Sequence, residues 1–254
     1  MLRDRKSFYV DAKGPDLDAV RSGLLWLSDA IRRRGCEGLL VVPDLRGLDH
    51  DVLKDVIGAE ATAGLKKRRR LTLNGDVVVT LATWAKLPTV WNGPMLVLHP
   101  DKAALDKIDA ILQVPEVLVV PWIPEEIHGW IATWGATDLL SGKSQRQNPL
   151  SPVVEEALRT LTRRVNVSTG ILHPNDRAAA IDLFKRLRGA RFKLEPEKIR
   201  QWLVRHNWAP RDAGAVKTLV EAIIDRRPIR GGRRAWADDI IDQLKSRVAK
   251  RAPS

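Results

Sequence analysis

Side chains able to bind or react with a ligand follow directly after the apolar runs of the N-terminal half. Asp11 and Lys13 follow the first run, Asp44 follows the second, and His99 and Trp122 follow two later ones. In an open parallel sheet, ligands bind in the crevice beyond the carboxyl ends of the strands. We therefore expect Lys13, His99 and Trp122 to line a ligand cleft.

Asp11 and Asp44 are candidate catalytic residues, because two carboxylates at strand ends could hold Mg²⁺ for phosphodiester hydrolysis. This pattern predicts a metal-dependent nuclease, the only interpretation that calls for a cofactor. The opposing interpretation is structural, since Asp is also an ordinary cap and turn residue between a strand and a helix. Asp101 fits a cap better than a catalyst. The five histidines are scattered, so we expect no metal site made from them.

Two segments of the C-terminal half concentrate positive charge. The first lies on and between three short predicted helices at 186–217, and the second is the Arg- and Gly-rich stretch 226–234, whose glycines would let the main chain approach a phosphate backbone. The predicted nucleic-acid-binding residues are Arg188, Arg191, Lys193, Arg200, Arg205, Arg211, Lys217, Arg226, Arg227, Arg230, Arg233 and Arg234. We expect residues 210–226 to be the recognition helix, because Arg211 and Lys217 lie towards its start. A flexible, solvated loop is the alternative for 226–234.

The net charge is distributed unevenly along the chain. The sequence carries 43 Lys and Arg against 31 Asp and Glu, a net charge of +12, and residues 141–254 hold 25 of the former and 12 of the latter. A generally basic surface would make both halves basic. Such asymmetry instead favours a polyanionic partner, DNA or RNA. An adaptor that binds an acidic protein stays open as an alternative. The run Lys66 to Arg70 suits either phosphate binding or an exposed loop.

The first half predicts an α/β domain over residues 1–140, a Rossmann-like three-layer sandwich with a mostly parallel sheet. Expected strands cover 7–12, 39–42, 95–98 and 117–120, with helices over 16–34, 50–70, 102–112 and 124–134. Asn74 and Gly75 are a strong hairpin signal, which favours two strands there rather than one strand at 77–81. Trp130 and Trp134 suit either an aromatic ligand pocket or packing between domains.

Residues 141–151 are small and polar and predict a linker. Beyond them, residues 152–254 predict an all-helical basic domain, helix-turn-helix or winged-helix in outline, with helices over 152–165, 174–188, 196–206, 210–226 and 235–251. Trp202 lies at helical spacing with Ile199 and Leu203, which indicates core packing.

Several function classes are disfavoured by what the sequence lacks. It has no Walker A motif, no Gly-rich dinucleotide fingerprint and no nucleophile elbow. The single cysteine, Cys36, excludes an internal disulfide and agrees with a reducing compartment. We find no secretory signal and no long apolar run, so we expect a cytoplasmic protein that does not contact a membrane.

Overall fold

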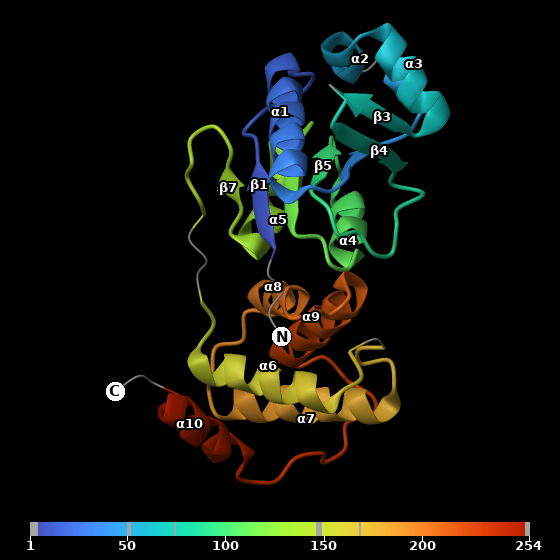
Figure 1. Cartoon of the computed structure of the whole chain (residues 1–254). Coiled ribbons are helices and arrows are strands. Elements are labelled where there is room, and N and C mark those ends of the chain that lie inside the picture. The colour runs from blue at the N-terminus through green and yellow to red at the C-terminus, as the bar shows by residue number, and fades with distance from the viewer. Residues whose placement is uncertain (1–4, 50–51, 74, 146–148, 168, 252–254) are drawn as a thin grey trace. The chain divides into compact units, whose positions relative to one another are not determined.

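The computed structural model describes residues 5–49, 52–73, 75–145, 149–167 and 169–251. The chain forms two compact units, one made of residues 4–147 and the other made mostly of residues 148–254. Figure 1 shows the strands in the first unit and helices in the second.

The described residues of the first unit alternate strands and helices. In chain order they form β1 (Lys6–Tyr9), α1 (Leu17–Arg34), β2 (Gly38–Val42), the 3-10 turn η1 (Gly47–Asp49), α2 (Val52–Ile57), α3 (Ala59–Arg68), β3 (Arg70–Leu73), β4 (Val77–Thr83), β5 (Met95–Leu98), α4 (Lys102–Ala110), β6 (Glu116–Val120), α5 (Pro124–Trp134) and β7 (Thr137–Asp138). The helical stretch predicted over 50–70 was expected to be broken at Gly58 and Gly64; it is broken at Gly58, which adopts φ 86°, while Gly64 lies inside α3.

These strands form one seven-stranded sheet in the order β3-β4-β2-β5-β6-β1-β7. The prediction of a mostly parallel α/β fold is confirmed, since every neighbouring pair is parallel except β3 with β4. The antiparallel β3-β4 pair is the predicted hairpin, although Asn74 in its turn lies outside the described residues. In this order, β5 and β6 lie between β2 and β1.

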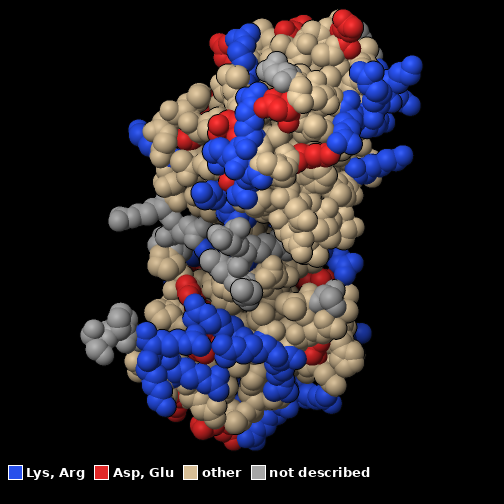
Figure 2. Space-filling model, viewed as in Figure 1, with Lys and Arg blue, Asp and Glu red and all other residues tan. Residues whose placement is uncertain are grey.

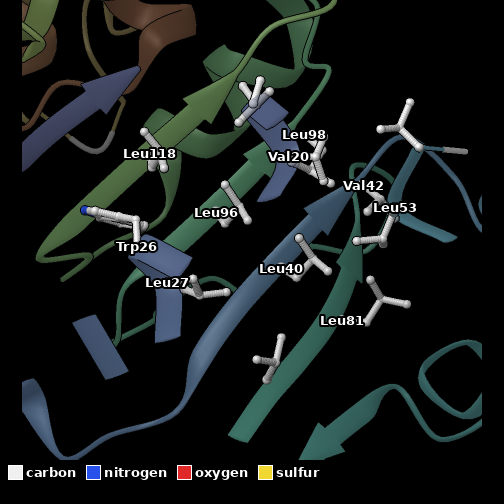
Figure 3. Packing of buried hydrophobic residues seen from close by; sticks show 14 of the residues in the cluster. Val20, Trp26, Leu27, Leu40, Val42, Leu53, Leu81, Leu96, Leu98 and Leu118 are labelled. Atoms are coloured by element: carbon white, nitrogen blue, oxygen red, sulfur yellow. The ribbon is translucent and has the colours of Figure 1, made fainter. Parts of the chain in front are cut away.

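Alternate residues of the central strands enter two apolar layers, one on each face of the sheet. Figure 3 shows Val20 and Leu27 of α1 directed at Leu40, Leu96 and Leu118, which point from three neighbouring strands into one layer. The intervening strand residues pack on the opposite face with α4 and α5; they are Leu39, Val41, Met95, Val97, Val117 and Val119. Helices therefore cover both faces of the sheet. The ends of the strands are not covered in this way.

The described residues of the second unit form helices and connecting segments and contain no strand, so the winged-helix alternative has no wing among them. The helices are α6 (Pro152–Arg164), α7 (Pro174–Gly189), α8 (Pro196–Arg205), α9 (Pro210–Ile224) and α10 (Ile240–Arg251). Trp202 is 2% exposed, which confirms its predicted place in the core. Within the described parts of both units, no helix has the length and apolar character needed to cross a membrane.

The last helix begins at Ile240 and not at the predicted residue 235. The reason is a tertiary contact, because the N–H groups of Ala235 and Trp236 both donate to Asp182 Oδ2 of α7, at 2.8 and 3.0 Å. A carboxylate that binds two successive backbone donors holds this segment in a non-helical path.

Candidate functional site

A pocket of about 520 Å³ opens where β2, β5 and β6 end, and we call it the acidic pocket. It is lined by Pro15, Pro43, Asp44, Gly47, Val52, His99, Asp101, Trp122 and Glu126. Three carboxylates and one histidine face it, and none of these lining residues is a lysine or arginine. Its wall is otherwise made of proline, valine and the indole of Trp122.

Two of these carboxylates are held in place by backbone N–H groups. Asp44 Oδ1 accepts from the N–H groups of Arg46 and Gly47 at 2.7 and 2.8 Å, and Asp101 Oδ1 accepts from Ala104 N at 2.6 Å. The N-cap role weighed for Asp101 is therefore observed, and Asp44 has a similar one before η1. Each contact uses Oδ1, so the second oxygen of each carboxylate is not part of the cap.

His99 and Trp122 form an aromatic pair in the acidic pocket. Their ring centroids lie 4.9 Å apart at an interplanar angle of 81°, an edge-to-face arrangement. His99 is 8% exposed and has φ 53°, a left-handed conformation that costs energy in a non-glycine residue. The backbone N–H of His99 donates to Val120 O at 2.7 Å. Trp122 is 43% exposed, so its ring stays open to a ligand.

Asp11 and Asp44 are not brought together. Because β5 and β6 separate their strands, the two strand ends lie roughly 14 Å apart at the usual spacing of sheet strands. Asp11 lines a different pocket of about 340 Å³, together with Tyr9, His128 and Lys143. Lys13 is exposed and is not among the residues that line the acidic pocket. Among the described residues, no group of three or more His, Cys, Asp or Glu is placed to hold a metal ion.

Trp130 and Trp134 belong to a buried polar cluster and line neither of these two pockets. Asp109 of α4 accepts from Arg5 at 2.7 Å and from both indole N–H groups of α5 at 3.1 Å. The guanidinium of Arg5 lies 3.5 Å from the centre of the Trp134 ring. Its side chain is 2% exposed and that of Asp109 6%, so the cluster is part of the core and ties α4 to α5.

Four of the predicted nucleic-acid-binding residues take part in the internal packing of the second unit. Arg188 donates to Ile223 O at 2.6 Å, and Lys217 lies 2.6 Å from Glu197. The side chain of Arg200 is 13% exposed and pairs with Glu197. Arg205 is half-buried, and burial lowers its pKa. These side chains are held within the protein and are poorly placed to reach phosphates.

Five more of the predicted residues are exposed at the ends of helices. Lys193, Arg211 and Arg227 each lie within 3.5 Å of an acidic side chain. Arg191 and Arg226, the other two, both adopt left-handed backbone conformations, at φ 63° and 55°. The predicted recognition helix, α9, therefore presents cations that are already paired with acids, Arg211 with Asp212 and Lys217 with Glu197.

The last three, Arg230, Arg233 and Arg234, are exposed on the segment 226–239, which we call the arginine loop. Trp236 fixes this loop: its indole N–H donates to Ala179 O at 2.8 Å, and the Arg164 guanidinium lies 4.4 Å from its ring centre. Hydrogen bonds from Ala235 N, Arg186 and Trp236 N hold the pKa of Asp182 below its usual value, although burial alone would raise it. These contacts hold residues 235 and 236, whereas the stretch 226–234 is almost entirely exposed, so a solvated loop stays open as the alternative for that stretch.

Exposed cations of α6 and α10 lie beside the arginine loop. Arg164 donates to Ala235 O of the loop at 2.8 Å, and Arg247 of α10 donates to Thr160 of α6 at 3.2 Å. We give the name basic face to the exposed cations of these three segments, Arg163, Arg164, Arg230, Arg233, Arg234, Arg247, Lys250 and Arg251. Figure 2 shows Lys and Arg gathered into a band over the region of α6 and α10.

Sequence reasoning missed the α6 and α10 part of the basic face. A signal existed in the i, i+4 spacing of Arg159 with Arg163 and of Arg247 with Arg251, opposite apolar stripes. One acid of the face is hidden: Glu156 is fully buried and binds Arg251 at 2.6 Å, while the Arg251 side chain stays 48% exposed. At this pair the cation is outermost, whereas Arg234 of the arginine loop is paired with the exposed Asp238.

Residues 150–245 match the model of a family described as a domain of unknown function, DUF1889. The match covers less than half of the chain, from α6 through the arginine loop into α10. No curated protein matches the sequence, and no solved structure matches the fold.

Proposed function

We propose that the protein binds DNA or RNA through the basic face of its helical unit. The observation that supports this most is the arrangement of exposed Lys and Arg side chains from α6, α10 and the arginine loop on one surface, around a loop whose backbone is fixed to α7. Neutralising several phosphates releases condensed counterions, which is the main source of affinity for such surfaces.

The fixed loop strengthens the proposal. An arginine on a disordered loop must lose conformational entropy when it binds, whereas the path of 235–236 is already set by Asp182. Arginine also donates a fork of N–H groups that matches a phosphate. Seven of the eight cations of the basic face are arginines. The surface therefore suits phosphate contacts more than base readout, and we propose no sequence preference.

We further propose that the first unit is a Rossmann-like domain that binds a ligand or a partner. We also propose that the protein resides in the cytoplasm. The nuclease alternative is weakened, because the separation of Asp11 from Asp44 removes the carboxylate pair on which it was based. Metal ions in two-metal sites lie about 3.5–4 Å apart, far less than three strand spacings.

The test is a salt titration with the full-length protein, measured by fluorescence anisotropy on a labelled duplex of about 20 bp and on the matching single strand. We expect affinity to fall steeply with salt, with a log-log slope of about −4 or steeper if five or more phosphates are contacted. No binding at low salt, or binding indifferent to salt, would overturn the proposal. Equal affinity for poly-glutamate would favour the adaptor that binds an acidic protein.

A further inference from the structure

We propose that the acidic pocket binds a small organic cation whose charged group meets the carboxylates and whose apolar or aromatic part lies on Trp122. The inference is independent of nucleic-acid binding, because it concerns the first unit alone. It identifies a ligand class for a site that no comparison assigns.

Charge excludes the anionic ligands that commonly bind at strand ends. Phosphates are usually held there by free N–H groups at a helix N-terminus and by nearby Lys or Arg. Here Asp101 accepts from Ala104 N in the first turn of α4, and Asp44 accepts from Arg46 N and Gly47 N at the start of η1, so carboxylates already occupy donors that an anion would use. Among the described residues that line the pocket there is no lysine or arginine. A phosphate or carboxylate would thus meet negative charge.

The same pocket is suited to a cation. Asp44, Asp101 and Glu126 approach it from three different segments. Asp44 and Asp101 are fixed by their caps, so their second oxygens need little reorganisation to accept from an ammonium or guanidinium group. Charge-assisted hydrogen bonds of this kind are about twice as strong as neutral ones.

Trp122 supplies the apolar side of the site. The residue is 43% exposed, and the edge-to-face contact with His99 limits the orientation of its ring. Indole is the best aromatic partner for a cation, and it also packs against flat apolar groups. Gly14 N donates to Trp122 O at 2.8 Å, which fixes the backbone at the same place. A ligand with both a positive charge and an apolar body would use the whole pocket.

Size and local strain agree with a small-molecule site. The volume of about 520 Å³ lies within the usual range of ligand pockets. His99 keeps a costly left-handed conformation at the pocket wall, and strain of this kind concentrates at functional sites. A metal ion is the weaker alternative occupant, since the described residues do not converge as a set of three metal-binding side chains.

Three probes of similar size separate the possibilities by charge: phenethylammonium, 2-phenylethanol and phenylacetate. Each is titrated into the full-length protein by isothermal titration calorimetry at about 50 mM salt. We expect phenethylammonium to bind at least about tenfold more tightly than the alcohol, and phenylacetate to bind more weakly than either. Phenylacetate binding as tightly as the ammonium, or no saturable binding of the ammonium at about 10 mM, would overturn the proposal.

Adjacent glutamates provide matched variants. Glu125 and Glu126 are both exposed in the first turn of α5, but only Glu126 lines the pocket. We expect Glu126→Gln and Trp122→Ala each to weaken phenethylammonium binding by about 3- to 30-fold, and Glu125→Gln to leave it unchanged. Equal effects of the two glutamate variants would show that the cation is held by general surface charge and contradict the site.

Discussion

The acidic pocket and the basic face hold their charged side chains in opposite ways. In the pocket, Asp44 and Asp101 are fixed by N–H groups of the turn that follows each of them, so contacts close in sequence set their positions. On the basic face, Arg164 and the arginine loop are fixed by contacts with residues more than 50 positions away. One chain therefore presents two proposed binding surfaces of opposite charge. The first depends on local turns and the second on the packing of its helices.

The largest expected effect concerns the buried cluster around Asp109, which ties α4 to α5. Asp109→Ala would leave Arg5 buried without its carboxylate, which typically costs about 3–5 kcal/mol. The same change loosens α4 and α5, which carry Asp101 and Glu126. We expect a lower midpoint in urea unfolding and weaker phenethylammonium binding.

The Asp109 variant also tests whether the two surfaces are independent. Nucleic-acid affinity at a temperature where the variant is folded should stay within about twofold of the wild type, because the basic face lies in the other unit. A parallel loss of both binding activities would contradict the separation drawn above.

A second effect, on the helical unit, appears as acid is added. The ring of His206 stacks on that of Trp202, with the ring centroids 3.5 Å apart. Burial lowers the pKa of His206 from 6.5 to about 4. Between these values the unfolded chain binds the proton more readily than the folded one, so stability falls as the pH drops from 7 towards 4. Above pH 7 this contribution to the pH dependence vanishes.

The measurement is chemical unfolding followed between pH 7 and pH 4.5. We expect His206→Gln to flatten the dependence on pH, whereas His173→Gln, at an exposed histidine of the same unit, should keep the wild-type slope. An unchanged slope in His206→Gln would mean that burial of this imidazole does not govern the acid response.

A third, smaller effect distinguishes a fixed basic face from mere positive charge. Asp182→Ala removes the acceptor of Ala235 N and Trp236 N, at a cost of about 2 kcal/mol in unfolding free energy. The variant is more positive than the wild type, yet we expect weaker nucleic-acid binding, because the arginine loop loses its anchor. Tighter binding in an anisotropy titration would show that net charge alone sets the affinity.

The smallest effect concerns the caps of the acidic pocket. Asp101→Ala should cost about 1 kcal/mol by removing the acceptor of Ala104 N, while Asp101→Asn should restore most of that loss because Asn is an equally good cap. Thermal unfolding measures both variants. Equal destabilisation by Ala and Asn would argue against the cap.

Local patterns predicted the parts of the fold that depend on neighbouring residues. The apolar runs at 39–42 and 95–98 are buried strands, and the predicted hairpin at Asn74-Gly75 corresponds to the antiparallel pair of β3 and β4 on either side of it. The order of strands depends on long-range packing, so nothing near Asp11 or Asp44 could reveal that two strands separate them. The short edge strand β7 was missed because its two residues carry no periodic pattern.

The same limit applies to the candidate site. His99 and Trp122 were found because residues that follow parallel strands lie at the carboxyl ends of the sheet, where ligands commonly bind. Arg188 and Lys217 look like binding residues in the sequence, but their partners, Ile223 O and Glu197, lie at least 20 positions away. Arg163 and Arg247 were overlooked for the converse reason, since only the contact of α10 with α6 brings them to one surface.

The most direct test of the central claim compares two triple variants of the full-length protein in a salt titration with duplex DNA. One neutralises the basic face with Arg163→Gln, Arg230→Gln and Arg247→Gln, and the other neutralises the exposed run Lys67→Gln, Arg68→Gln and Arg69→Gln in the first unit. We predict that the first lowers the log-log salt slope by about 2 to 3 and weakens binding more than tenfold, while the second changes affinity less than about threefold. Equal losses in the two variants, or no loss in the first, would contradict the assignment of binding to the basic face.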